Sequence, residues 1–376
     1  MKKGKMPEAV VRLMCFLLGI LLTVAAVLIK DRVIAGMTEE IAESIETVAT
    51  AEETTIPVET ATVDYESVAE EKYEKMQADA EASKPEEEQK KNEKDEFIID
   101  GKTSKLNWNM DYPPLDIEGT LAENEAEESS YDYTMSVNAF DRKVIENSKI
   151  DFSDVKITIM GDSITEGSNL SDEEKPIYNY PKILQEILGC KEVVNLGIGG
   201  SVVSSCASSF AMVDRWDDIP EDSDIVIIFG GTNDCLYMNK WDFGELEYDK
   251  RMKNDTFCGD LDEMCSAMKW KFHDNMTDRY VKLIYVNPMS TILNDGVYAT
   301  DPGNMVAQVS FAEAINEIVP DYDFAVIDLY NSNFLNSHDE QINHQFTPDG
   351  VHPNTDGYRI LAEHLASEII QRIKTE

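Results

Sequence analysis

Positive charge is scarce in this sequence. The chain contains 33 lysines and arginines against 73 aspartates and glutamates, which gives a formal net charge of -40 at pH 7. A chain this acidic is repelled by the phosphates of nucleic acids and by anionic lipid surfaces. We therefore expect no nucleic-acid partner.

Cysteine is also rare, and its spacing is irregular. One cysteine, Cys15, lies in an apolar segment near the N-terminus, and the other five lie at positions 190, 206, 235, 258 and 265. An odd number with no framework spacing excludes a disulfide scaffold, although one or two pairs remain open.

Only one long apolar run occurs, from Leu13 to Ile29. Basic residues precede it at positions 2, 3, 5 and 12, and Lys30-Asp31-Arg32 follows it. At about 1.5 Å per residue the run is just long enough to span hydrocarbon. The flanking charges predict a cytoplasmic N-terminus (1–12), a transmembrane signal anchor (13–29) and an exported remainder, hence a single-pass protein of the cell membrane. Secretion after cleavage of a signal peptide is the alternative.

Large apolar residues are sparse between residues 30 and 135. This stretch is rich in Glu, Ala, Thr and Lys, a composition that cannot bury enough apolar surface to fold. It is predicted to be an acidic, low-complexity stalk, with some transient helix around Val68 to Ala82. Residues from 98 to about 151 include Trp108 and Tyr112 and could be partly ordered against the domain, but no function is assigned to them.

The pattern changes near Lys156 to short apolar runs that alternate with helical periodicity. The runs at 156–160, 192–196, 224–229, 281–286 and 324–329 are nearly continuous in apolar character, as in parallel strands covered on both faces. Helical spacing is present at 180–188, 257–271, 306–318 and 356–374. The class is α/β, and we expect one domain over 150–376, a three-layer α/β/α sandwich with a five-stranded parallel sheet.

Three segments follow the ends of predicted strands, where ligands bind in such sheets. Gly161-Asp162-Ser163 follows the first strand and places a serine where a nucleophile would sit, although a lone motif of this kind more often caps a helix. Gly197-Ile198-Gly199-Gly200 follows the second and Gly230-Gly231-Thr232-Asn233 the third. Backbone N–H groups and an Asn amide are the parts of an oxyanion hole. A dinucleotide loop is disfavoured, because the spacing is not G-x-G-x-x-G.

An Asp and a His stand three residues apart before the last predicted helix, in Asp349-Gly350-Val351-His352. On one short loop the carboxylate can hold one ring nitrogen while the other faces a serine. His338, Asp339 and His344 lie nearby, but we interpret them as solvated loop residues and expect no metal. Asp162 and Asp234 are interpreted as loop stabilisers.

Together these segments resemble the sequence blocks of the SGNH hydrolase superfamily, also called GDSL esterases and lipases. The resemblance covers about Lys156 to Lys374, and Ile164 stands where the family has leucine. It implies a flavodoxin-like fold, Ser163 as nucleophile, His352 as base and Asp349 as its orienting partner. The oxyanion donors would be Ser163, Gly200 and Asn233, with Gly199 as an alternative to Gly200. No cofactor is implied.

The resemblance and the predicted export point to an extracytoplasmic serine esterase. Its substrates would be acyl esters, with acetyl groups favoured, on carbohydrate or lipid, and an acetylated polysaccharide is the favoured partner. Two alternatives remain open: an O-acetyltransferase acting on cell-surface glycan, and a catalytically silent glycan-binding surface protein.

Overall fold

The computed structural model describes residues 64–82, 96–112, 129–206, 210–237, 240–248, 255–276, 278–292 and 306–374. The predicted N-terminal segments 1–12 and 13–29 lie outside these residues. Among the helices that are described, none has both the length and the apolar character needed to cross a membrane.

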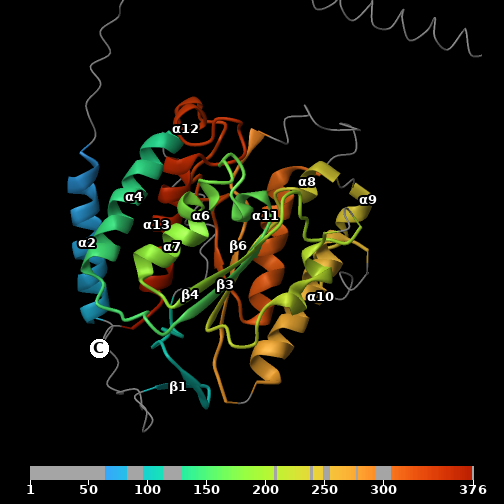
Figure 1. Ribbon diagram of the computed structural model, residues 1–376, viewed down its shortest axis with the longest axis horizontal. Helices are drawn as coiled ribbons and strands as arrows, with labels where there is room; N and C mark the ends of the chain where they lie inside the picture. The colour runs from blue at the N-terminus through green and yellow to red at the C-terminus, as the bar shows by residue number, and fades with distance from the viewer. Residues whose placement is uncertain are drawn as a thin grey trace, which may run out of the picture. The chain divides into compact units, whose positions relative to one another are not determined.

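A parallel sheet forms the centre of the described region (Figure 1). Its five strands run in the order β4-β3-β5-β6-β7, and all neighbours pair in parallel. The strands are β3 (Lys156–Gly161), β4 (Glu192–Gly197), β5 (Ile225–Phe229), β6 (Lys282–Val286) and β7 (Ala325–Ile327). All five predicted strands are confirmed, and this order is that of flavodoxin-like folds.

Helices cover both faces of the sheet, which confirms the three-layer architecture (Figure 1). On one face, residues of α7 (Tyr180–Leu188) and α13 (Thr355–Gln371) share an apolar cluster with Ile157 and Ile159. On the other face, residues of α10 (Phe257–Lys269) and α11 (Gln308–Ile318) share a cluster with Val226 and Ile228. Alternate residues of one strand thus face opposite layers, which is why these strands read as continuous apolar runs.

The helix ends follow local sequence signals. Asn179 caps α7 by accepting the Lys182 N–H, and Gly189 ends it in the left-handed conformation. Thr256 caps α10 by accepting the Gly259 N–H. Side-chain acceptors at the first position and glycine beyond the last are the usual termini of α-helices. After α10 the chain continues through a π-helical turn (Trp270–Asp274).

Short helices occupy the loops between these elements. They are α5 (Ser163–Glu166), α6 (Lys175–Tyr178), α8 (Asp234–Tyr237), α9 (Lys240–Phe243) and α12 (Glu340–Gln345), with 3-10 turns at Met212–Asp214, Trp216–Asp218 and Val319–Tyr322. Most of them follow the carboxyl ends of strands.

The folded unit includes residues well before 150, which corrects the prediction of a stalk over 30–135 for the described residues 64–82, 96–112 and 129–135. One compact unit spans residues 63–376. It includes α2 (Tyr65–Ala82), a hairpin of β1 (Phe97–Ile99) and β2 (Lys102–Ser104), and α4 (Ser130–Asn147). Trp108, with 1% of its surface exposed, is part of the apolar core.

The α4 helix docks on α13 partly through polar pairs, which an apolar pattern does not reveal. Asn138 donates to Glu363 Oε2 at 2.7 Å, and Asp141 pairs with the His364 ring at 2.9 Å. Both partners lie on α13. Because such pairs join elements more than 200 residues apart, a periodicity of apolar residues does not report them.

Candidate active site

Ser163 lies at the carboxyl end of β3, as the first residue of α5. The turn is tight, because a Cβ on Gly161 would lie 2.0 Å from Thr165 Oγ1 and 3.0 Å from the Phe229 carbonyl oxygen. Asp162 caps α5 by accepting the Ile164 N–H at 2.9 Å, in keeping with its interpretation as a loop stabiliser. As the first helical residue, Ser163 has a backbone N–H with no partner inside the helix.

The structure brings His352 and Asp349 to Ser163. His352 Nε2 lies 2.8 Å from Ser163 Oγ, and His352 Nδ1 lies 2.7 Å from Asp349 Oδ2. The second oxygen of Asp349 accepts the N–H groups of Val351 at 2.9 Å and His352 at 2.7 Å. Asn169 donates to the His352 carbonyl at 2.9 Å, which ties this loop to the one after α5. The three predicted residues therefore form one hydrogen-bonded chain.

Asp349 is ionised at any working pH. Desolvation raises the pKa of this carboxyl, but the hydrogen bonds from the His352 ring and from two backbone N–H groups outweigh it and lower the pKa to about 2. Because this folded-state value lies below the usual 3.8, the bonds stabilise the folded state above about pH 4 and are lost as pH falls toward 2.

Activity is expected to rise with pH, because the His352 ring must be neutral to accept the Ser163 proton. Burial raises the pKa of Asp162 to about 6 and that of Asp234 to about 7, so these two carboxyls also change charge near neutral pH. The ring resonances of His352, followed by NMR, separate the three groups. The midpoint of kcat/KM should coincide with the His352 titration, and a midpoint that follows another group instead would remove His352 as the base.

The glycine loop after β4 forms a turn with free donors. Ser201 N–H donates to the Ile198 carbonyl at 3.0 Å, and Gly200 has a φ of +74°, a conformation that favours glycine. Within the described residues, the N–H groups of Gly199 and Gly200 donate to no protein atom. A Cβ on Gly200 would meet nothing within 4 Å, whereas one on Gly199 would lie 2.6 Å from Glu166 Oε2. The open side of the turn is therefore at Gly200.

Asn233 is held against the same turn. Its side chain is nearly buried and donates to the Ser201 carbonyl at 2.9 Å. Because an amide NH2 carries two hydrogens, the second remains available to a ligand.

Two buried aspartates fix this loop, and the sequence singled out only one of them. Asp234 accepts the N–H groups of Val203 at 2.9 Å and Ser204 at 3.1 Å. Asp260, on α10, accepts the Ser204 hydroxyl at 2.6 Å and the Ser205 N–H at 2.8 Å. Asp234 thus stabilises a loop, as interpreted from the sequence. Asp260 was missed because it lies in the first turn of α10, 56 residues along the chain from Ser204.

Arg215 makes a second link that the sequence did not reveal. Its guanidinium donates to the carbonyls of Leu196 at 2.7 Å and Gly161 at 2.8 Å, and to the Ser201 hydroxyl at 3.0 Å. One side chain therefore joins the ends of β3 and β4 to the oxyanion turn. An arginine in an irregular segment carries no sequence signal of such a role.

The other candidate residues have structural contacts. Asp339 caps α12 by accepting two N–H groups and also accepts the Tyr131 N–H at 3.1 Å. The ring nitrogen Nδ1 of His338 lies 3.0 Å from the side-chain oxygen of Asn336. Among the described residues, no group of three or more His, Cys, Asp or Glu side chains is placed to hold a metal. Phe243 stacks on Phe257, which is buried in the core.

A serine, a histidine and an aspartate in hydrogen-bonded series at the carboxyl edge of a parallel sheet define the serine hydrolase class. Residues 159–360 match the GDSL-like Lipase/Acylhydrolase family, which is more than half of the chain. The chain therefore belongs to the GDSL-like lipase/acylhydrolase family, a family of ester hydrolases.

Individual relatives are more distant. An acetylxylan esterase of Xylanibacter ruminicola is 28% identical over 224 residues, which cover 57% of this chain and 43% of that protein. The chain thus spans less than half the length of this curated relative. One crystal structure is similar at 25% identity and a TM-score of 0.50, covering 60% of this chain and 100% of that one. A protein from Lactobacillus plantarum is similar at 24% identity and a TM-score of 0.46, covering 58% and 97%.

Proposed function

We propose that this protein is a serine esterase that hydrolyses short acyl esters, with Ser163 as nucleophile, His352 as general base and Asp349 as its orienting partner. The hydrogen-bonded series of these three side chains, at 2.8 Å and 2.7 Å, carries the proposal. A catalytically silent binding protein has no use for this arrangement, because a partly buried histidine aligned on a serine adds little to stability.

In this mechanism His352 Nε2 takes the Ser163 proton while Ser163 Oγ attacks the ester carbonyl carbon. The N–H groups of Ser163 and Gly200 and the second amide hydrogen of Asn233 donate to the resulting oxyanion. The intermediate collapses, and His352 returns its proton to the leaving alcohol. Water, activated by the same histidine, then releases the acid and restores Ser163.

Asn233→Ala is expected to lower kcat by roughly 10²–10³, the usual effect of losing one oxyanion donor. Steady-state kinetics on p-nitrophenyl acetate measure it. The variant also loses the bond to the Ser201 carbonyl, so its unfolding curve must be compared with that of the wild type. A rise in KM with kcat unchanged would make Asn233 a substrate-binding residue.

We further propose acetylated polysaccharide as the substrate. Support comes from the relative named an acetylxylan esterase, although it is only 28% identical. Incubation with acetylated xylan fragments, followed by NMR, tests this reaction. Free acetate should appear in proportion to lost acetyl ester. Acetyl groups that reappear on an added sugar acceptor would instead indicate the O-acetyltransferase.

An exported location, with residues 13–29 as anchor, is proposed from the apolar run and its flanking charges. The full chain should stay with membranes through high-salt and carbonate washes, and external protease should digest its domain. Recovery of a soluble form that lacks roughly the first 30 residues would instead support cleavage of a signal peptide.

A further inference from the structure

A cavity of about 440 Å³ lies at the end of the sheet opposite to Ser163. Its wall includes Lys282, at the start of β6, and Ala325, at the start of β7, whereas Ser163 follows the carboxyl end of β3. Because all strands of the sheet are parallel, the starts of β6 and β7 lie at the end of the sheet opposite to the carboxyl end of β3. The cavity is therefore separate from the proposed catalytic site.

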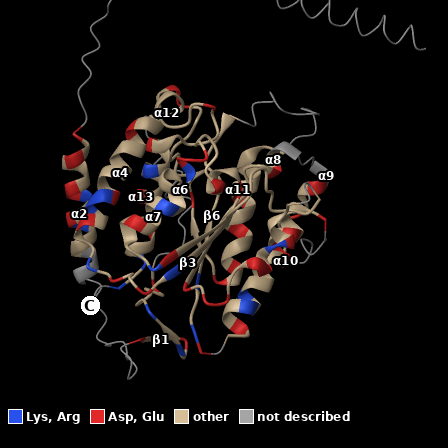
Figure 2. Cartoon of the chain, viewed as in Figure 1, with Lys and Arg blue, Asp and Glu red and all other residues tan. Residues whose placement is uncertain are grey.

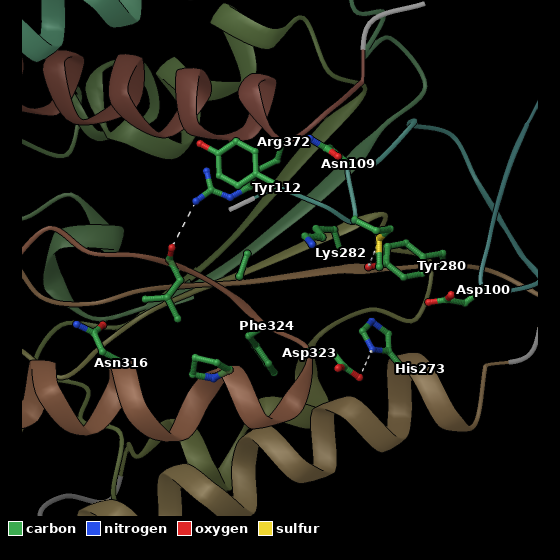
Figure 3. A pocket seen from close by; sticks show the side chains of 14 residues that line it. Asp100, Asn109, Tyr112, His273, Tyr280, Lys282, Asn316, Asp323, Phe324 and Arg372 are labelled. Carbon is green, nitrogen blue, oxygen red and sulfur yellow. Dashed lines mark hydrogen bonds and ion pairs between the residues drawn. The ribbon is translucent and has the colours of Figure 1, made fainter. Parts of the chain in front are cut away.

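Lys282 is the distinctive side chain of this cavity (Figure 3). Within the described residues its ammonium makes no hydrogen bond and no ion pair, and its one polar contact is the Trp108 ring, 5.6 Å away. Two of the neighbouring charges are already compensated, and the Asp100 carboxylate at the cavity is exposed to solvent. Arg372 pairs with Glu368 at 2.5 Å, and Asp323 pairs with Lys269 at 2.8 Å. Removing an ammonium from water is costly unless it is paired, so one positive charge in the cavity lacks its counter-ion.

The remaining wall can recognise a polar ring. The Tyr112 hydroxyl and the Asn109 amide NH2 have no acceptor among the described residues, and both residues line the cavity (Figure 3). The Asp100 carboxylate can accept hydroxyl hydrogens, and Tyr280 adds an aromatic surface. Aromatic walls with a few converging polar groups are typical of small-molecule sites of this volume.

We propose that this cavity binds a sugar unit that carries a single carboxylate, a uronate, with the carboxylate paired to Lys282. Lys282 is a single cation without a direct partner, so it can pair with one negative charge, whereas a doubly charged phosphate would be repelled more strongly by Asp323 and Asp100. The sugar hydroxyls donate to Asp100 and accept from Tyr112 and Asn109. Binding here is independent of the esterase reaction, so Ser163→Ala should bind the uronate as the wild type does.

The charge of Lys282 gives this binding a defined pH dependence. Desolvation, aided by Arg372 and opposed by Asp323, lowers the pKa of Lys282 to about 8. The other titratable groups at the cavity are Asp100, His273, Tyr112 and Tyr280. Burial raises the pKa of both tyrosines, that of Tyr112 to about 12, so they stay neutral. Affinity should therefore fall about tenfold between pH 7 and pH 9, as the ammonium loses its proton.

Calorimetric titration of the full chain with D-glucuronate tests the site. We expect saturable binding that D-glucose does not reproduce and that acetate and inorganic phosphate reproduce at least tenfold more weakly. Lys282→Met, which replaces the ammonium by an apolar side chain of similar length, should weaken binding by roughly tenfold or more. Lys182→Met, on the exposed side of α7, is the matched control and should leave the affinity unchanged.

Three results would overturn the site: no binding of glucuronate, binding unaffected by Lys282→Met, or acetate and phosphate binding as tightly as glucuronate. The pH series uses the unaltered protein, so it decides the matter even if the Lys282 variant folds poorly. An affinity that stays constant from pH 7 to pH 9 is equally decisive against the assignment.

Discussion

Ser163→Ala is expected to lower kcat for ester hydrolysis by about 10⁴–10⁶ while the fold stays intact, because members of a triad act as a unit. The Ser163 hydroxyl contacts the His352 ring at 2.8 Å, and its loss leaves no nucleophile. Turnover of p-nitrophenyl acetate measures the effect, and a urea unfolding curve checks the fold.

The matched control is Ser171→Ala, at an exposed position in the turn that follows. It should retain activity within about twofold, since its hydroxyl accepts the Glu174 N–H, at 3.3 Å, in a turn outside the triad. If Ser163→Ala kept activity within roughly tenfold of the wild type, Ser163 would not be the nucleophile.

Asp349→Asn is expected to lower kcat by as much as ~10⁴. In the wild type Asp349 Oδ2 accepts the Nδ1 hydrogen of His352 at 2.7 Å, which fixes the ring tautomer with Nε2 facing Ser163. An amide can present its NH2 group there and favour the wrong tautomer. Steady-state kinetics at the pH optimum measure the effect.

The matched control is Asp356→Asn, which removes a nearby carboxylate at an exposed position in the first turn of α13. Its kcat should stay within about twofold of that of the wild type. A loss of less than about tenfold in Asp349→Asn would show that another group orients His352, and Asp349 would then have only a structural role in its loop.

The sheet was predictable because its strands are short, apolar runs. Predicted and observed bounds agree within two residues at each end of all five, from β3 at Lys156–Gly161 to β7 at Ala325–Ile327. The helix α7 was predicted with its observed bounds, since a capping Asn179 and a terminal Gly189 mark them. The site residues were predictable because each follows the end of a strand or precedes a helix, where a parallel sheet must bring them together.

The segments before residue 150 could not be placed from composition. The α4 helix docks through buried polar Thr134, Asn138 and Asp141 together with apolar Ala139 and Val144, so composition alone does not mark its contact face. Trp108 is a single large residue in a polar stretch, and its burial depends on neighbours that are distant in sequence. The hydrogen bonds of Asp260 to Ser204 and of Arg215 to Gly161 were missed for the same reason, because their partners belong to other elements.

Covalent labelling with a fluorophosphonate, which reacts with activated serine hydroxyls, tests the central assignment most directly. Digestion and mass spectrometry of the labelled chain should place the phosphonyl group on Ser163, and His352→Ala should suppress labelling together with ester hydrolysis. A label on a different serine that disappears in step with activity, or full activity in a chain that Ser163 labelling has blocked, would contradict the account.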